Sequence, residues 1–224
     1  MESIPFYIPF GFVLTALVTI FLFYRAANNS KLVVLILSIW LIVQSAIAYA
    51  GFYVESFNFP PRFLVLVSPP LIVIISLFLT KKGRAFIDQF DQRKLTYLHT
   101  VRIPVELILY GLFVYGLIPD LMTFEGRNFD ILAGLTAPFI GYFGYTKMRI
   151  GNRWKLLWNM VSLALLLNIV IHAILSAPTP FQQIAFDQPN IAIVYFPYNL
   201  LPGLIVPLVL LSHLACIRSI RLNS

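Results

Sequence analysis

Charged residues are scarce in this sequence. Only 11% of its 224 residues are Asp, Glu, Lys or Arg, whereas 59% are apolar. An ordinary soluble domain has about 25% charged residues, so water is not the main solvent of this chain. Apolar spans of about 20 residues with short loops would use nearly all of residues 1–224. We therefore expect one compact domain and no separate soluble domain.

Cysteine is almost absent, because Cys216 is the only one. A single thiol excludes an intrachain disulfide and a cluster of thiolate ligands around a metal. The sequence also lacks the HExxH, glycine-rich phosphate-loop, GxSxG and DxD patterns, and the last apolar stretch has no lysine for a retinal Schiff base. We expect no metal and no cofactor. Two histidines, His99 and His213, would suit a haem only on facing helices, and nothing in the sequence brings them together.

Seven long apolar stretches account for most of the chain. They cover residues 5–24, 32–53, 63–80, 103–119, 131–146, 156–176 and 191–215. In hydrocarbon an open strand would leave backbone groups unpaired, and these stretches lack the alternating polarity of a barrel strand. The sequence therefore predicts an all-α, polytopic membrane protein with seven transmembrane helices. We interpret the first stretch as a retained span, since no basic region precedes it.

Basic residues lie mainly in the connections on one side of the predicted spans. Fourteen of the 16 Lys and Arg residues fall on that side, and only Arg62 and Arg127 fall on the other. The positive-inside rule then predicts an outside N-terminus and a cytoplasmic C-terminus, in the cell membrane. The loops build no continuous basic face, so we expect the lipid bilayer, and not nucleic acid, as the partner. The connection 81–102 is predicted either to lie along the headgroups or to form a solvated loop helix.

Prolines and small residues indicate how the spans pack. The third, fifth and seventh stretches contain prolines, which free backbone carbonyls and bend helices. We therefore expect kinks that widen the bundle locally. Ala133, Ala137 and Gly141 recur at intervals of four, and this stripe predicts close approach of another helix.

Polar residues inside apolar stretches are costly in a membrane and are therefore candidates for function. The sixth stretch carries an amide and an imidazole one turn apart, and the second and seventh carry further amides and tyrosines. If these faces converge, they form an outward-opening polar pocket with charged loop residues at its mouth. The predicted ligand-binding residues are His172, Asn168, Tyr198, Asn199, Gln44, Tyr49, Glu125, Arg127 and Asp187.

Two other acids have a structural interpretation. Asp130 is predicted to cap the start of the fifth stretch. Glu106 lies in the first turn of the fourth stretch, where it suits the positive end of the helix and can pair with Arg102. No set of catalytic residues is apparent.

The pattern favours a small-molecule transporter or permease-like binding protein with its pocket between spans 2, 6 and 7. One alternative is an intramembrane enzyme acting on a lipid or lipid-linked substrate at the outer leaflet, with His172 as acid or base beside Glu125 or Asp187. Another is a sensor or assembly subunit whose loops bind a partner. The sequence does not identify the ligand, and the oligomeric state stays open.

Overall fold

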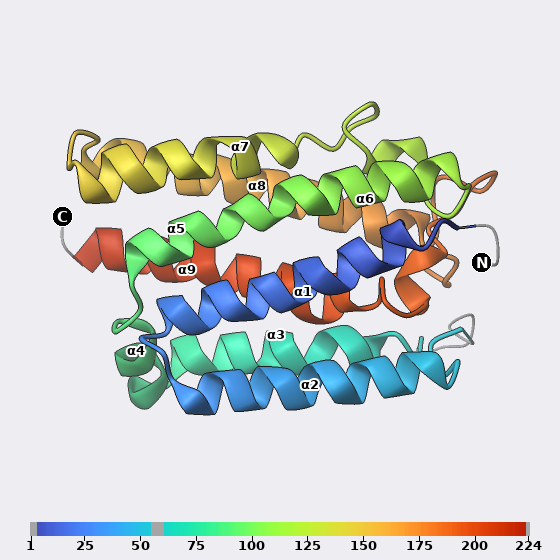
Figure 1. Ribbon diagram of the computed structural model, residues 1–224, viewed down its shortest axis with the longest axis horizontal. Coiled ribbons are helices and arrows are strands. Elements are labelled where there is room, and N and C mark those ends of the chain that lie inside the picture. The colour runs from blue at the N-terminus through green and yellow to red at the C-terminus, as the bar shows by residue number, and fades with distance from the viewer. Residues whose placement is uncertain (1–3, 55–60, 223–224) are drawn as a thin grey trace.

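The computed structural model describes residues 4–54 and 61–222, and within them every regular element is helical (Figure 1). The long helices run along the long axis of the molecule, with α2 and α3 along one edge and α7 and α8 along the opposite edge. The elements are α1 (Tyr7–Ala26), α2 (Lys31–Tyr49), α3 (Leu64–Leu79), α4 (Lys81–Ile87), α5 (Gln92–Leu98), η1 (His99–Val101), α6 (Arg102–Val114), η2 (Asp120–Met122), α7 (Ile131–Phe139), η3 (Ile140–Thr146), α8 (Asn152–Ser176), η4 (Ala192–Val194), η5 (Leu201–Ile205) and α9 (Val206–Leu222).

Five helical runs in the described residues are long and apolar enough to cross a membrane. They are Tyr7–Ala26, Lys31–Tyr49, Gln92–Val114, Asn152–Ser176 and Leu201–Leu222. A sixth is obtained if α3 and α4, which meet at 98°, count as one broken span. Large apolar side chains such as Leu35, Ile39 and Ile42 lie exposed on α2. Such an apolar exterior is compatible with a helical membrane protein.

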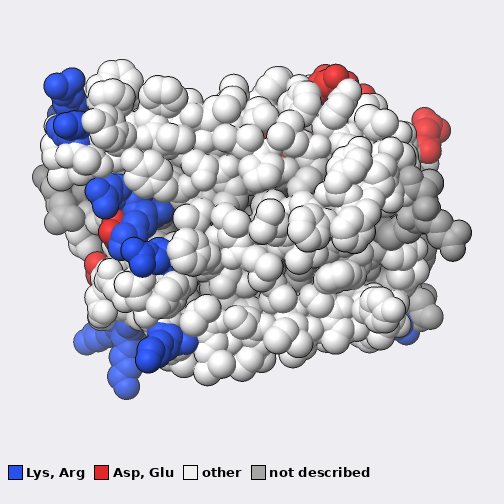
Figure 2. Space-filling model, viewed as in Figure 1, with Lys and Arg blue, Asp and Glu red and all other residues white. Residues whose placement is uncertain are grey.

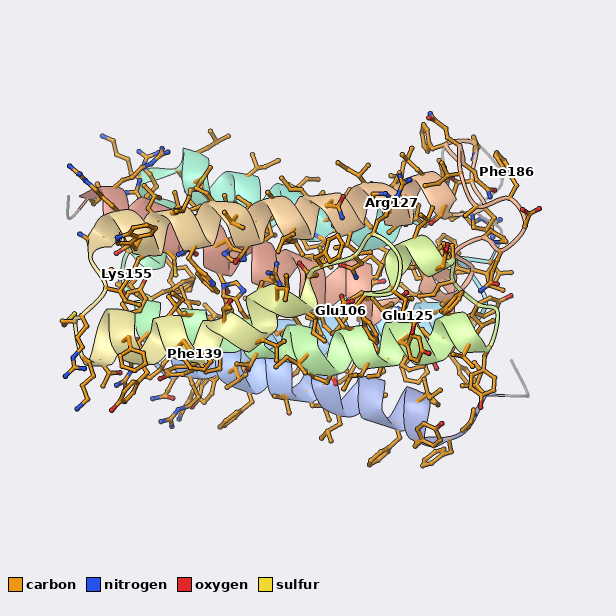
Figure 3. The ribbon with its side chains drawn as sticks, turned by 90° about the horizontal axis from the view of Figure 1, so that it is seen from above. Glu106, Glu125, Arg127, Phe139, Lys155 and Phe186 are labelled. Atoms are coloured by element: carbon orange, nitrogen blue, oxygen red, sulfur yellow. The ribbon has the colours of Figure 1, made fainter. Side chains whose placement is uncertain are left out.

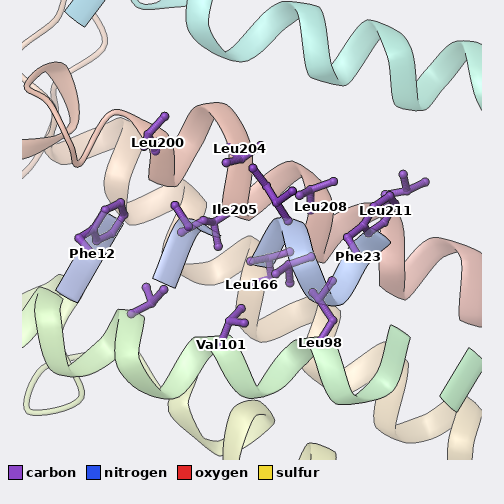
Figure 4. Close-up of a cluster of buried hydrophobic side chains, with 14 of the residues drawn as sticks. Phe12, Phe23, Leu98, Val101, Leu166, Leu200, Leu204, Ile205, Leu208 and Leu211 are labelled. Carbon is purple, nitrogen blue, oxygen red and sulfur yellow. The ribbon is translucent and has the colours of Figure 1, made fainter. Parts of the chain in front are cut away.

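The helices differ widely in how far they enter the interior. Within the most apolar 18 residues of each run, 72% are buried in Leu201–Leu222 but only 11% in α2. Figure 4 shows side chains of α1, of the α5 to α6 run, of α8 and of α9 meeting in one apolar cluster, including Phe12, Leu98, Leu166 and Leu204. The last span is therefore the central helix, and α2 is peripheral.

The fourth span begins earlier than the sequence predicted. Helix α5 continues through η1 into α6, so that one run extends from Gln92 to Val114. Leu95 and Leu98 are fully buried, because α5 packs between α1 and α9. The prediction that 81–102 is a headgroup or loop helix is therefore wrong for its second half. Arg93 and Lys94 lowered the local hydropathy and concealed the start of the helix.

Two spans lose regular α-helical backbone near prolines. Helix α7 contains Pro138 and changes at Ile140 into the π-helical turns of η3. The last span starts with the π-helical element η5, which contains Pro202, and it begins ten residues later than predicted because residues 191–200 form η4 and irregular backbone. Helix α3 stays helical through Pro69 and Pro70. The fifth and seventh stretches thus change helix type near their prolines, while the kinks themselves stay a prediction.

The small-residue stripe packs closely, as predicted. Ala133, Ala137 and Gly141 are buried, and a Cβ atom added at Gly141 would lie 2.9 Å from Cζ of Tyr97. Only a glycine lets the aromatic ring of Tyr97, on α5, approach this backbone so closely. The stripe therefore brings α7 and η3 against the α5 to α6 run.

The connection between α6 and α7 enters the bundle. Met122, Thr123 and Asn128 are buried, although they precede α7, which starts only at Ile131. In Figure 1 this connection occupies the length beside α6 that a longer α7 would fill. Irregular backbone is tolerated inside a membrane protein where surrounding protein satisfies its polar groups. The start of α7 consequently lies inside the molecule.

Candidate functional site

A cluster of charged side chains lies at this inner start of α7. Arg102, the first residue of α6, is 2% exposed, and its Nε atom lies 3.1 Å from Oδ2 of Asp130. Both terminal nitrogens of Arg102 also donate to the carbonyl of Ser162, at 3.2 Å. Since Ser162 lies near the middle of α8, the pair is held deep in the bundle by three helices.

Glu106 lies one turn further along α6 and is 1% exposed. Nδ2 of Asn128 lies 2.7 Å from each of its carboxylate oxygens. The same nitrogen donates to the carbonyl of Met122, and Oδ1 of Asn128 accepts from the backbone N–H of Asp130. Asn128 therefore links Glu106 to Asp130. In Figure 3 Glu106 lies in the interior, with Lys155 toward one end of the molecule and Phe186 at the other.

These contacts correct the predictions for both acids. Asp130 does precede α7, but its side chain makes no capping hydrogen bond and pairs instead with Arg102. Glu106 is well inside the run Gln92–Val114 and is not in its first turn. Its hydrogen-bond partner is Asn128, and Arg102 pairs with Asp130. Both differences arise because the helical run already begins at Gln92 and because the connection between α6 and α7 enters the bundle.

Two stacked histidines lie beside the ionic pair. The rings of His99 and His213 are 3.8 Å apart and inclined by 19°, and Trp158 packs at 5.5 Å from the first and 5.8 Å from the second. Nδ1 of His213 lies 2.9 Å from Oδ1 of Asn159. Both nitrogens of His99 and Nε2 of His213 are buried without a hydrogen-bond partner among the described residues.

This arrangement does not suit a haem. Rings 3.8 Å apart leave no space for a porphyrin and its iron between them. In the described part of the chain, no three His, Cys, Asp or Glu side chains gather as ligands for a metal ion. The sequence could not find the pair, because His99 and His213 belong to helices far apart in the chain.

Two predicted site residues, Asn168 and His172, lie in the C-terminal half of α8. The side-chain amide of Asn168 donates to the carbonyl of Arg127 at 2.9 Å, and Nδ1 of half-buried His172 lies 2.8 Å from the carbonyl of Asn168. Arg127, Glu125 and Asp187 have exposed side chains. Nδ1 of His172 therefore contacts its own helix, and not Glu125 or Asp187, the acids of the enzyme alternative.

A second group of predicted site residues lies between α2 and the start of the last span. Nδ2 of Asn199 donates to the backbone carbonyl of Gln44 at 3.1 Å, and the hydroxyl of Tyr53 donates to Oε1 of Gln44. Tyr198 is buried beside Phe12, at 5.4 Å between rings. The structure therefore brings Gln44 and Asn199 together, whereas Tyr198 packs against α1.

Tyr49 does not join this group, because it is 86% exposed. Two shallow hollows of the described surface lie elsewhere. One is lined by Tyr7, Gly111 and Tyr115 among others, and the other by residues of α3 and α4. A single pocket that also includes Asn168 and His172 stays a prediction.

Charge is distributed unequally between the two ends of the molecule. Figure 2 shows Lys and Arg side chains mainly at the end that carries α4, while Asp and Glu side chains appear at both ends. At the basic end, Arg218 of α9 donates to both carboxylate oxygens of Asp88, at 2.7 and 2.9 Å. That hydrogen bonding lowers the pKa of Asp88 below its ordinary value.

Comparison with known proteins gives a family and no described activity. No curated protein and no solved structure matches this sequence. A family model described as a domain of unknown function, DUF8737, matches residues 59–221, which include α3 to α9 and the whole buried ionic cluster. The chain therefore belongs to the DUF8737 family.

Proposed function

We propose that this protein is a transporter of the cell membrane whose transport path runs through the buried polar cluster between α6, α7, α8 and α9. The observation that carries the proposal is the buried ion pair of Arg102 and Asp130 beside Glu106, because Arg102 and Glu106 lie in a run, Gln92–Val114, that is long and apolar enough to cross a membrane. Charged side chains are expensive there and are found mostly where ions or polar solutes pass.

Interrupted helices support the same proposal. Helix α7 starts inside the bundle at Asp130, and the last span starts with irregular backbone and π-helical turns. Transporters commonly form their sites at such discontinuous helices, because freed backbone groups and helix ends can contact a solute there. In this proposal Asn168 and His172 form the outer entrance, on the same helix as Ser162.

The proposed topology has seven spans, with the N-terminus outside and the C-terminus in the cytoplasm. In addition to the five long runs and the bent pair α3–α4, the unit formed by α7 and η3 is counted as a span, the fifth in chain order, which is short because the connection between α6 and α7 enters the bundle. The excess of Lys and Arg at the end with α4 supports a cytoplasmic location for that end.

Reporter fusions test this topology. Fusions after residues 28, 90 and 151 should report the cytoplasm, and fusions after 125 and 185 the exterior. A fusion after residue 58, which lies outside the described residues, should also report the exterior. A reversed result at two or more sites contradicts the topology.

Thiol accessibility tests the path without knowledge of the solute. Cys216 is buried and is the only cysteine, so Cys216→Ser gives a background for single cysteines. Ser162→Cys should react with a small, charged thiosulfonate reagent added to intact vesicles, because the path admits water. Ala164→Cys is the matched control on the exposed face of α8 and should stay unreactive in lipid. Equal inertness of both thiols in folded protein contradicts the proposal.

A further inference from the structure

The charges of the buried cluster do not balance. Arg102, Asp130 and Glu106 act electrostatically on one another, and with all three ionised the cluster would keep one negative charge in excess. Arg102 directs its guanidinium to Asp130 and to the carbonyl of Ser162. Within the described residues Glu106 has no ion pair, and one amide nitrogen, that of Asn128, serves both of its oxygens.

In the part of the chain that the structure describes, no second cation pairs with Glu106. From η1 and α9 come His99 and His213, which stack on each other within electrostatic reach of Arg102. Helix α8 contributes the carbonyl of Ser162, and its Lys155 lies with Nζ over the ring of Tyr145, at 4.7 Å. Where α1 meets α6, Ile8 lies against Gly111. An uncompensated carboxylate in such a place costs several kcal/mol and normally takes up a positive charge.

We infer that Glu106 is a proton-binding site, occupied in the resting protein and exchangeable during the transport cycle. The inference rests on the proposed function and names the ion that would be coupled to transport. A second observation points to the same place: Oδ1 of Asp130, 4% exposed, is without a hydrogen-bond partner in the described residues. A proton on Glu106 would allow its carboxyl group to donate a hydrogen bond to that oxygen. Water can deliver the proton past the imidazole nitrogens of His99 and His213 that have no hydrogen-bond partner in the described residues.

Infrared spectroscopy on the purified full chain in nanodiscs tests the site directly. At neutral pH the wild type should show the carbonyl band of a protonated carboxylic acid. The band should shift when glutamate carries a ¹³C carboxyl label, and it should disappear in Glu106→Gln. Asp120→Asn, an exposed acid on the loop before α7, is the matched control and should retain it. The labelled wild type keeps the test valid if Glu106→Gln folds poorly.

Three results would overturn the inference. They are the absence of the band in the wild type, its loss only in Asp130→Asn, and its loss when Na⁺ or K⁺ replaces a large organic cation at constant pH. The last result would identify a metal cation in place of the proton. The band does not depend on transport, so its presence with an inert Ser162→Cys would refute the path alone. Its absence with a reactive Ser162→Cys would refute the proton site alone.

Discussion

The bundle contains two buried polar regions that differ in charge. Around Gln44, Tyr53 and Asn199 the groups are neutral amides and a phenol; Tyr53 donates to the side chain of Gln44, and Asn199 donates to the backbone carbonyl of Gln44. Around Arg102, Asp130 and Glu106 the groups are ionisable and would have one negative charge in excess if all three were ionised. A buried neutral group without a partner costs about 1–3 kcal/mol, whereas an unpaired charge costs much more. The neutral region can therefore be static structure, whereas the charged one needs a compensating positive charge, which we propose is an exchangeable proton.

Removal of Arg102 should have the largest effect on stability. Arg102→Gln leaves the buried carboxyl of Asp130 without its cation, and we expect a loss of about 3–5 kcal/mol in the free energy of unfolding. Thermal unfolding in detergent measures the loss. In the double variant Arg102→Gln with Asp130→Asn, neutralising the partner should recover a substantial part of it. If the double variant is no more stable than Arg102→Gln, the two side chains are not coupled.

The neutral region should respond less strongly. Gln44→Leu removes the hydrogen bond between the hydroxyl of Tyr53 and Oε1 of Gln44, which should cost about 1–3 kcal/mol. Adding Tyr53→Phe removes that hydroxyl, so Gln44→Leu with Tyr53→Phe should be more stable than Gln44→Leu alone. Thermal unfolding in detergent measures the stability of both variants. A double variant that loses the sum of both single effects would mean that the two side chains act independently.

The exposed pair Asp88–Arg218 should contribute least. Its side chains are partly exposed to solvent, and solvent screening leaves such pairs little effect on stability. Because Arg218 lowers the pKa of Asp88 in the folded protein, the contribution is present above the ordinary aspartate pKa and is lost as pH falls through the lowered value. Unfolding of wild type and Asp88→Asn should therefore differ slightly at neutral pH and converge in acid. A difference that grows in acid contradicts this assignment.

The sequence predicted what depends on hydropathy and local backbone chemistry. Apolar stretches indicated the helices, Pro138 and Pro202 mark the spans with π-helical turns, and Gly141 marks the close contact with Tyr97. These features follow from neighbouring residues in the chain. They required no knowledge of tertiary contacts.

The polar interior could be predicted only in part. Gln44 and Asn199 were expected to converge and do meet, but Tyr49 faces outward. The ionic cluster was missed because Arg93 and Lys94 made the start of the fourth span resemble a loop, which assigned Arg102 and Glu106 to a helix end. The inward course of residues 115–130, which brings Asn128 to Glu106, leaves no periodic signal in the sequence.

Charge movement after a pH step tests the central claim, a transport path with an exchangeable proton at Glu106, most directly. Proteoliposomes adsorbed on a solid-supported membrane receive a rapid change of external pH, and the transient current is recorded. We expect a current in the wild type and in Asp120→Asn, because protons bind inside the membrane even without a solute. We expect no such current in Glu106→Gln. Equal currents from wild type, Glu106→Gln and protein-free liposomes would contradict the account.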